Sequence, residues 1–226
     1  MKTVEPHTPI QYIVGRADFC GMDIAVDERV LIPRPETELL VDAAIEKCSS
    51  ISSAQYPIRI LDLCTGSGNI AIAILTKGIT DCKIVASDVS ADALEVARYN
   101  AQRYNAGSMI EFVESDLFNN LNGVFDIIIS NPPYIAKDEF CTLQKEVLKE
   151  PHLALYGGAD GLDFYSRIIS ESPPHLKKGS YIILEIGYGQ AEDVVNIVEF
   201  GNNFKVVDII KDFNGIDRVV TARWIN

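Results

Sequence analysis

Long hydrophobic runs are missing from this chain of 226 residues. No stretch reaches the roughly 18 or more apolar residues that would span a bilayer, and the N-terminus lacks the pattern of a secretion signal. Internal repeats and low-complexity tracts are missing as well. We therefore expect a soluble, cytoplasmic protein with one large domain, whose core is supplied by the 47% of residues that are hydrophobic.

Cysteine and histidine are scarce and scattered. The five cysteines form no close Cys-x-x-Cys pair, so neither a disulfide framework nor a zinc site is indicated, and we expect reduced thiols. The three histidines lack metal-ligand spacing and offer no local support for a catalytic triad. The sequence therefore predicts no metal site.

Basic residues are few relative to acidic ones. The chain has 20 Lys and Arg against 32 Asp and Glu, which gives a formal net charge of −12. Extended binding to a phosphate backbone depends on clustered Lys and Arg, so we expect no direct nucleic-acid binding. A basic protein partner is electrostatically easier, although an acidic surface that keeps a protein soluble explains the charge equally well.

Short apolar runs alternate with helix-length amphipathic segments from Ile58 onward, which is typical of a parallel α/β sheet. Only residues 115–124 separate the third and fourth runs, so we expect a tight crossover or loop there. Ser90 is a plausible N-cap for the helix that follows the second run. The five strands are predicted at residues 58–63, 83–87, 110–114, 125–130 and 181–186.

The C-terminal end breaks this alternation. Residues 204–210 and 218–224 also read as strands, but the connection between them is too short for a parallel crossover. With Asn214-Gly215 inside the connection, an antiparallel hairpin is expected. An ordinary dinucleotide-binding fold continues with further parallel strands, so the hairpin favours a methyltransferase fold.

Upstream of the sheet, residues 11–32 are predicted to form a small antiparallel element. A helix follows, with Pro35 suited to its first position. Residues 49–57 read as a linker. The predicted organisation is an N-terminal hairpin and helix element at 1–48, the linker at 49–57, and a sheet domain at 58–226.

A glycine-rich loop joins the first predicted strand to a helix. Gly66 and Gly68 remove Cβ atoms that would block a ligand, and the helix N-terminus offers unpaired N–H groups. Asp88 ends the next strand, where a carboxylate can accept hydrogen bonds from two ribose hydroxyls. Asp116 and Leu117 could hold an adenine, or belong to a simple loop. The candidate residues in the loop itself are Cys64, Thr65, Gly66, Ser67 and Gly68.

This loop predicts a nucleoside cofactor without deciding which one. Residues 66–71 also fit the Gly-x-Gly-x-x-Ala form of an NAD site, and a tight turn without any ligand is a further alternative. The C-terminal hairpin favours S-adenosylmethionine. So does the Asn-Pro-Pro-Tyr segment at residues 131–134.

The Asn-Pro-Pro-Tyr segment closes a strand that reads as buried on both faces. Pro132 and Pro133 have no N–H, so their carbonyl oxygens are the only backbone polar groups there. With the Asn131 side chain and the Tyr134 ring, these acceptors suit a planar amino group. An ordinary proline-rich turn is the alternative. Glu185 ends the fifth strand at the same edge and could meet a substrate or be solvated.

Several motifs together resemble the release-factor glutamine methyltransferases of the HemK/PrmC type. They cover nearly the whole chain in the family's order, and Ile-Pro-Arg-Pro-Glu-Thr-Glu combined with Asn-Pro-Pro-Tyr is highly specific. The matching segments are residues 9–15, 31–38, 62–68, 130–135, 150–155, 158–162 and 184–187.

The resemblance implies a class I S-adenosylmethionine-dependent methyltransferase with a Rossmann-like, mostly parallel sheet. Its expected substrate is the side-chain amide of the glutamine in the Gly-Gly-Gln motif of peptide chain release factors. Catalytic roles are expected for Asn131, Pro132, Pro133 and Tyr134, and Asn131 is also expected to contact the cofactor. Thr37 and Glu36 could line the cofactor pocket or simply begin a helix.

Two departures from the family pattern stand out. Members usually carry an N-terminal helical domain that helps to dock the release factor, whereas this sequence begins almost at the Pro-Ile-Gln-Tyr segment. Cys64 stands where the family commonly has glycine. The alternatives are a glutamine methyltransferase acting on a ribosomal protein, an enzyme that methylates the exocyclic amine of adenine, and a catalytically inactive cofactor-binding module.

Overall fold

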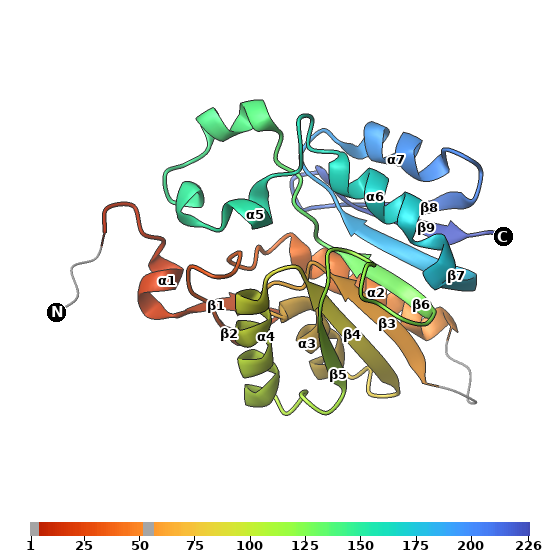
Figure 1. Cartoon of the computed structure of the whole chain (residues 1–226), viewed down its shortest axis with the longest axis horizontal. Coiled ribbons are helices and arrows are strands. Elements are labelled where there is room, and N and C mark those ends of the chain that lie inside the picture. Colours follow the sequence, from red (N-terminus) through yellow and green to blue (C-terminus); the bar gives the residue numbers. More distant parts are fainter. Residues whose placement is uncertain (1–4, 52–56) are drawn as a thin grey trace.

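The computed structural model describes residues 5–51 and 57–226. Within them, one seven-stranded sheet has the order β5-β4-β3-β6-β7-β9-β8 (Figure 1). The first five strands in this order, from β5 to β7, are parallel to one another. Strand β9 pairs antiparallel with both β7 and β8. The strands are β3 (Ile58–Leu63), β4 (Cys82–Asp88), β5 (Ile110–Glu114), β6 (Phe125–Ser130), β7 (Leu176–Glu185), β8 (Phe204–Lys211) and β9 (Asp217–Trp224).

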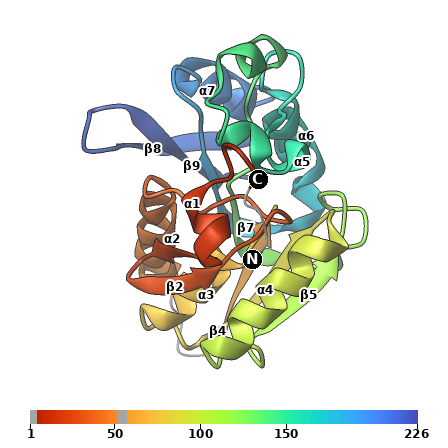
Figure 2. The same cartoon turned by 90° about the vertical axis from the view of Figure 1, so that its left-hand side faces the viewer.

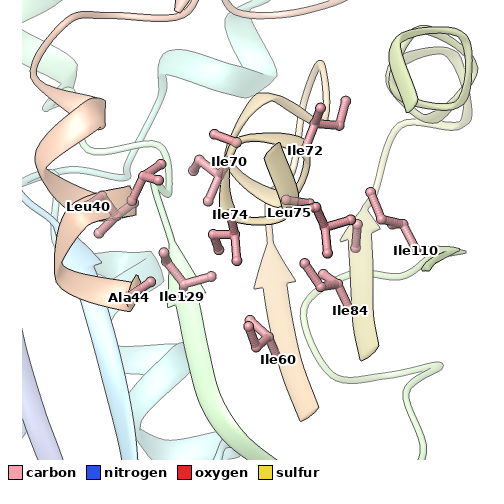
Figure 3. Close-up of a cluster of buried hydrophobic side chains, with 14 of the residues drawn as sticks. Leu40, Ala44, Ile60, Ile70, Ile72, Ile74, Leu75, Ile84, Ile110 and Ile129 are labelled. Carbon is pink, nitrogen blue, oxygen red and sulfur yellow. The ribbon is translucent and has the colours of Figure 1, made fainter. Parts of the chain in front are cut away.

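Helices cover both faces of this sheet and enclose two apolar clusters. One face packs against α2 (Thr37–Ile51), α3 (Asn69–Thr76) and α4 (Ala91–Arg103). Figure 3 shows Ile70 and Ile74 of α3 beside Leu40 of α2 and above the isoleucines of the central strands. The other face packs against α6 (Asp163–Glu171) and α7 (Ala191–Glu199). The short helix α5 (His152–Leu155) lies between β6 and α6 in the chain.

The class I methyltransferase topology expected from the sequence is confirmed. Strands β3, β5 and β6 have the predicted bounds, and the C-terminal hairpin forms as β8 and β9. This hairpin reaches away from the rest of the molecule in Figure 2. Ser90 caps α4, accepting a hydrogen bond from the Ala93 N–H at 3.1 Å, and no helix interrupts residues 115–124.

The N-terminal prediction was wrong at its start. Helix α1 (Ile10–Val14) occupies the first part of the predicted antiparallel element, because Gly15 ends it in a left-handed conformation and donates to the Gln11 carbonyl. Strands β1 (Arg16–Phe19) and β2 (Met22–Ala25) then form the expected hairpin. Cys20 and Gly21 both have positive φ at its turn, as a type I′ turn requires.

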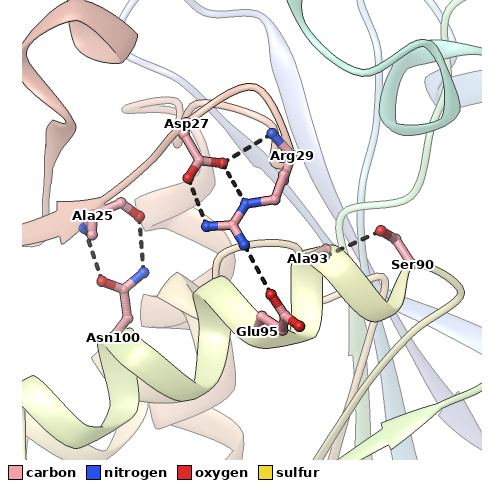
Figure 4. Close-up of polar contacts among 7 residues, drawn as sticks. All are labelled: Ala25, Asp27, Arg29, Ser90, Ala93, Glu95 and Asn100. Carbon is pink, nitrogen blue, oxygen red and sulfur yellow. Dashed lines mark hydrogen bonds and ion pairs between the residues drawn. The ribbon is translucent and has the colours of Figure 1, made fainter.

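The hairpin is fastened to the sheet domain through α4. The buried Asn100 side chain accepts from the Ala25 N–H at 2.8 Å and donates to the Ala25 carbonyl at 2.9 Å (Figure 4). Arg29 also bridges Asp27 and Glu95. These contacts bring the segment after β2 to the edge of the sheet where the ligand site is expected.

Helix α2 begins at Thr37, after a turn in which the Glu38 N–H donates to the Pro35 carbonyl. The predicted helix start at Pro35 is therefore two residues early. Helix α2 continues to Ile51, so the first three residues of the predicted linker are helical, and residues 52–56 lie outside the described part. The division into domains stays a prediction. No described helix is long and apolar enough to cross a membrane.

Candidate active site

The candidate residues follow directly after strand ends that lie in register. Leu63 pairs with Ser87 on one side and with Ser130 on the other, and Asp88 pairs with Glu114. The glycine loop, Asp88, Asp116 and Asn131 therefore leave the sheet at one edge. Ligands gather at this carboxyl edge in open parallel sheets.

The glycine loop is shaped by residues that stand in unusual backbone conformations. Cys64, Gly66 and Gly68 all have positive φ, at 59°, 54° and 78°. Glycine adopts this region without strain, so the conformation is costly only at Cys64. A Cβ on Gly66 would meet nothing within 4 Å, whereas one on Gly68 would lie 3.1 Å from the Ala97 Cβ. Gly66 therefore leaves room for a ligand, and Gly68 allows α3 and α4 to pack closely.

The remaining loop residues hold the loop in place. The Thr65 hydroxyl donates to Asp62 at 2.6 Å, and the Asn100 side chain donates to the Ser67 carbonyl at 3.0 Å. Asp62 is fully buried, and this burial raises its pKa to about 7. Thr65, Ser67 and Gly68 do not line the ligand pocket described below, so their predicted contact with a cofactor stays untested.

Asp88 lies beside the glycine loop. Its carboxylate accepts from the Gly66 N–H at 2.9 Å and from the Ser90 N–H at 3.0 Å, while burial raises its pKa. Each carboxylate oxygen has two lone pairs, so both oxygens can still accept a ligand hydroxyl.

Asp116 and Leu117 follow β5 at the same edge of the sheet. Arg167 donates to Asp116 at 2.9 Å and fixes its carboxylate. The Ser115 hydroxyl donates to the Leu117 carbonyl at 2.7 Å and accepts from the Asn120 N–H. These contacts hold Leu117 in its left-handed conformation, with a φ of 46°.

The pocket enclosed by these residues opens to solvent. Of the predicted residues, it is lined by Cys64, Gly66, Asp88, Asp116, Leu117, Asn131 and Pro133. Sequence reasoning missed the opposite wall, formed by residues 29–31, 151, 153–154 and Phe164, because only tertiary folding brings these segments to the sheet edge.

Asn131 stands between this pocket and a second one. The second pocket is lined by Asn131, Pro132 and Tyr134, together with Arg34 of the N-terminal segment and Ala154 of α5. The side-chain amide nitrogen of Asn131 donates to the Thr37 hydroxyl at 3.2 Å. The four predicted catalytic residues are therefore divided between two adjoining pockets that share Asn131.

Glycines close tightly around Tyr134. A Cβ on Gly157 would lie 2.7 Å from the Tyr134 Cα, and one on Gly187 would lie 3.0 Å from its ring. The Gln190 side chain donates to the Tyr134 carbonyl at 3.0 Å. Burial raises the pKa of the Tyr134 hydroxyl, which keeps this group neutral.

Two buried carboxylates, those of Glu150 and Glu185, support the structure around the Asn-Pro-Pro-Tyr segment. Glu150 accepts from the Ile32 N–H at 3.0 Å and forms an ion pair with Arg34, which joins the two segments that wall both pockets. Glu185 is only 2% exposed, so the alternative of a solvated side chain was wrong. Burial raises its pKa to about 7.

Comparisons with known proteins agree with this arrangement. The Methyltransferase small domain family matches residues 49–160. Among solved structures, a methyltransferase from Pyrococcus furiosus has a TM-score of 0.63 at 20% identity, covering 96% of this chain and 95% of its own. A ribosomal protein L11 methylase from Lactobacillus delbrueckii has a TM-score of 0.61 at 20% identity, covering 90% of this chain and 86% of its own. At such identities the likeness concerns the fold.

Curated relatives are much closer in sequence. The release factor glutamine methyltransferase of Chlorobaculum tepidum is 43% identical, over 93% of this chain and 72% of the relative. That of Lactococcus lactis is 41% identical, over 98% of this chain and 80% of the relative. With this identity along nearly all of the sequence, on a methyltransferase fold with an Asn-Pro-Pro-Tyr corner at its ligand edge, the chain belongs to the release factor glutamine methyltransferase family.

Proposed function

We propose that this protein transfers a methyl group from S-adenosylmethionine to the side-chain amide nitrogen of the glutamine in the Gly-Gly-Gln motif of peptide chain release factors. The observation that carries the proposal is the position of Asn131 on the wall shared by two pockets. A residue there can contact a cofactor on one side and a substrate amide on the other.

The larger pocket fits the cofactor. Gly66 leaves space beside the backbone, and Asp88 can accept hydrogen bonds from the ribose hydroxyls. Asp116 can accept from the adenine amino group, and the buried Leu117 offers an apolar contact. When bound, S-adenosylmethionine supplies an electrophilic methyl group on a sulfonium centre.

The Asn-Pro-Pro-Tyr corner supplies acceptors for the substrate. An amide nitrogen is a poor nucleophile because its lone pair is delocalised, so its orientation has to be fixed. The Asn131 side-chain oxygen and the Pro132 carbonyl can accept its two hydrogens and aim the nitrogen at the cofactor side. Pro133 stiffens the corner and Tyr134 packs against the flat amide. The nitrogen becomes acidic as positive charge develops on it, so no strong general base is required.

The test is one incubation of the protein with purified release factor and S-adenosylmethionine, followed by mass spectrometry of the Gly-Gly-Gln peptide. We expect a single added methyl group on the glutamine side chain. Asn131→Ala should abolish transfer while calorimetry still detects cofactor binding, and the exposed Asn196→Ala serves as the matched control. Parallel incubations contain ribosomal protein or DNA. Transfer only to one of these, or full activity of Asn131→Ala, would overturn the proposal.

A further inference from the structure

The two prolines of the Asn-Pro-Pro-Tyr segment limit how backbone hydrogen bonds can hold it in place. Strand β6 pairs with β7 up to Ser130, which lies opposite Leu184. The prolines follow, and because they have no N–H, the parallel ladder cannot continue through them. The Ile135 N–H, which donates to the Leu155 carbonyl at 2.9 Å, lies beyond both of them. A further group is therefore needed to fix the segment between Ser130 and Ile135.

That group is the side-chain amide of Gln190, the residue before α7. Its Nε2 atom donates to the Tyr134 carbonyl at 3.0 Å and to the Gly161 carbonyl at 3.4 Å. Its Oε1 atom accepts from the Gly187 N–H at 2.9 Å and from the Tyr165 hydroxyl at 3.3 Å. A primary amide has two hydrogens to donate and two lone pairs that accept, so the whole capacity of Gln190 is used.

The backbone partners fix the orientation of this amide. An N–H only donates and a carbonyl only accepts, so Oε1 has to lie at Gly187 and Nε2 at Tyr134. Two glycines leave the room that the amide needs. A Cβ on Gly187 would lie 2.7 Å from Oε1 of Gln190, and one on Gly161 would lie 2.7 Å from its Nε2. Gln190 therefore links the end of β7 to the Asn-Pro-Pro-Tyr segment, just where the ladder of β6 and β7 stops.

We propose that Gln190 is a positioning residue for methyl transfer, which fixes Tyr134 and the proline carbonyls of the segment for the substrate amide. The inference rests on the proposed function, because it takes the Asn-Pro-Pro-Tyr segment to hold that amide. Gln190 lines neither of the two pockets that share Asn131, so it acts through Tyr134 without touching substrate or cofactor. Acceptors that are held in place before the substrate binds need no rearrangement during the reaction.

The same contacts select which carbonyl oxygens remain for a substrate. The Tyr134 carbonyl is taken by Gln190, and the Ile135 carbonyl accepts from the Gly157 N–H at 2.9 Å. Across residues 5–51 and 57–226, no backbone N–H donates to the carbonyl of either proline in the segment. A substrate amide therefore meets proline carbonyls that no backbone donor occupies, while the carbonyls after them are already engaged.

The kinetic test uses Gln190→Glu and Gln190→Met at pH 8, with release factor as the methyl acceptor. Glutamate has nearly the same shape and can still accept from the Gly187 N–H, but a carboxylate cannot donate to Tyr134. Methionine keeps the length of the side chain without its amide. We expect kcat to fall about tenfold in both, the effect of losing one hydrogen bond, while the KM for release factor stays within about twofold. The exposed Gln102→Met serves as the control, and a normal kcat in either variant of Gln190 would overturn the proposal.

Counting cofactor sites separates positioning from a general loss of folded protein. Calorimetry measures both the cofactor Kd and the number of cofactor molecules bound per chain. Both should match the wild type in the two variants, because Gln190 lies outside the cofactor pocket. If kcat falls only in proportion to the number of sites, the substitution has merely unfolded part of the protein, and the positioning role is refuted.

The Tyr134 carbonyl can also be observed directly by NMR. In protein labelled with ¹³C at the tyrosine carbonyls and with ¹⁵N in isoleucine, each Tyr-Ile pair gives one signal. The pairs in this sequence are residues 12–13, 134–135 and 181–182. Ile13→Val and Ile182→Val each remove one of the other two signals, which assigns the signal of Tyr134.

This measurement separates the inference from the proposed function. Gln190→Met should shift the carbonyl frequency of Tyr134, because its hydrogen bond is lost, and leave the other two signals in place. If no methyl group reaches the release factor, the proposed function fails, and the carbonyl frequency alone decides whether Gln190 holds Tyr134. An unshifted Tyr134 signal refutes the positioning role even if the release factor is methylated.

Discussion

Replacing Glu185 by glutamine should change the pH dependence of folding stability. Burial raises the pKa of Glu185 from 4.5 to about 7 in the folded state. The folded protein therefore binds this proton more tightly than the unfolded chain does. Stability from this group is greatest below pH 4.5 and declines as the pH rises toward 7, where the folded protein also loses the proton.

The size of the effect follows from the difference in pKa. Ionised Glu185 should cost the folded state about 3 kcal/mol at pH 8 and less than about 1 kcal/mol at pH 5. Glutamine cannot ionise, so Glu185→Gln avoids this cost. The free energy of unfolding of the variant, relative to the wild type, should therefore be higher by about 2–3 kcal/mol at pH 8 than at pH 5.

Urea unfolding at the two pH values measures this difference directly. Any pH-independent cost of burying the new amide cancels, and so does the titration of Asp62, because both proteins contain it. Glu111→Gln, at an exposed position in β5, serves as the control. If the difference between Glu185→Gln and the wild type is the same at pH 5 and pH 8, the carboxylate is not desolvated and the reasoning is refuted.

Three further substitutions test the frame of the site. Asp88→Ala should weaken cofactor binding at least tenfold in calorimetry, because it removes an acceptor for the ribose and a partner of the Gly66 N–H. Asn100→Ala should lower the free energy of unfolding by about 2–4 kcal/mol in urea titrations, since it leaves the backbone of Ala25 and the Ser67 carbonyl unpaired. Gly157→Ala should abolish methyl transfer in the mass-spectrometric assay, because its Cβ would lie 2.8 Å from the Pro133 carbonyl oxygen. Unchanged cofactor affinity of Asp88→Ala would contradict the first expectation. A change in the free energy of unfolding below about 1 kcal/mol for Asn100→Ala would contradict the second, and normal methyl transfer by Gly157→Ala would contradict the third.

Local sequence patterns predicted the strands and loops whose structure depends mainly on neighbouring residues. The apolar runs ending at Leu63 and Ser130 identified buried parallel strands, and parallel register then required the glycine loop and Asn131 to meet at one edge. Gly66 and Asp88 were placed by the same logic. The helix α1 was missed although Pro9 and Gly15 flank it, since a segment of five residues carries little periodicity.

Contacts between distant segments could not be read from the sequence. Thr37 looked like a helix start, and the structure shows that it is one, but its hydrogen bond to Asn131 spans 94 positions of the chain. Glu185 was correctly predicted at the carboxyl edge of the sheet, but its burial depends on how α2 lies across β7. The walls at residues 29–31, 151 and 153–154 depend on the buried Glu150, whose partners are more than 100 positions away.

The placement of charge around the corner suits methyl transfer to an amide. Positive charge moves onto the substrate nitrogen during the reaction, so acceptors already aimed at its hydrogens stabilise the transition state more than the ground state. Neutral acceptors such as Asn131 and the Pro132 carbonyl can do this without a full charge at the nitrogen. The hydrogen bond from the Asn131 amide nitrogen to the Thr37 hydroxyl polarises the amide and makes the Asn131 oxygen a stronger acceptor. On this view the hydrogen bond to Thr37 orients the acceptor before the substrate arrives.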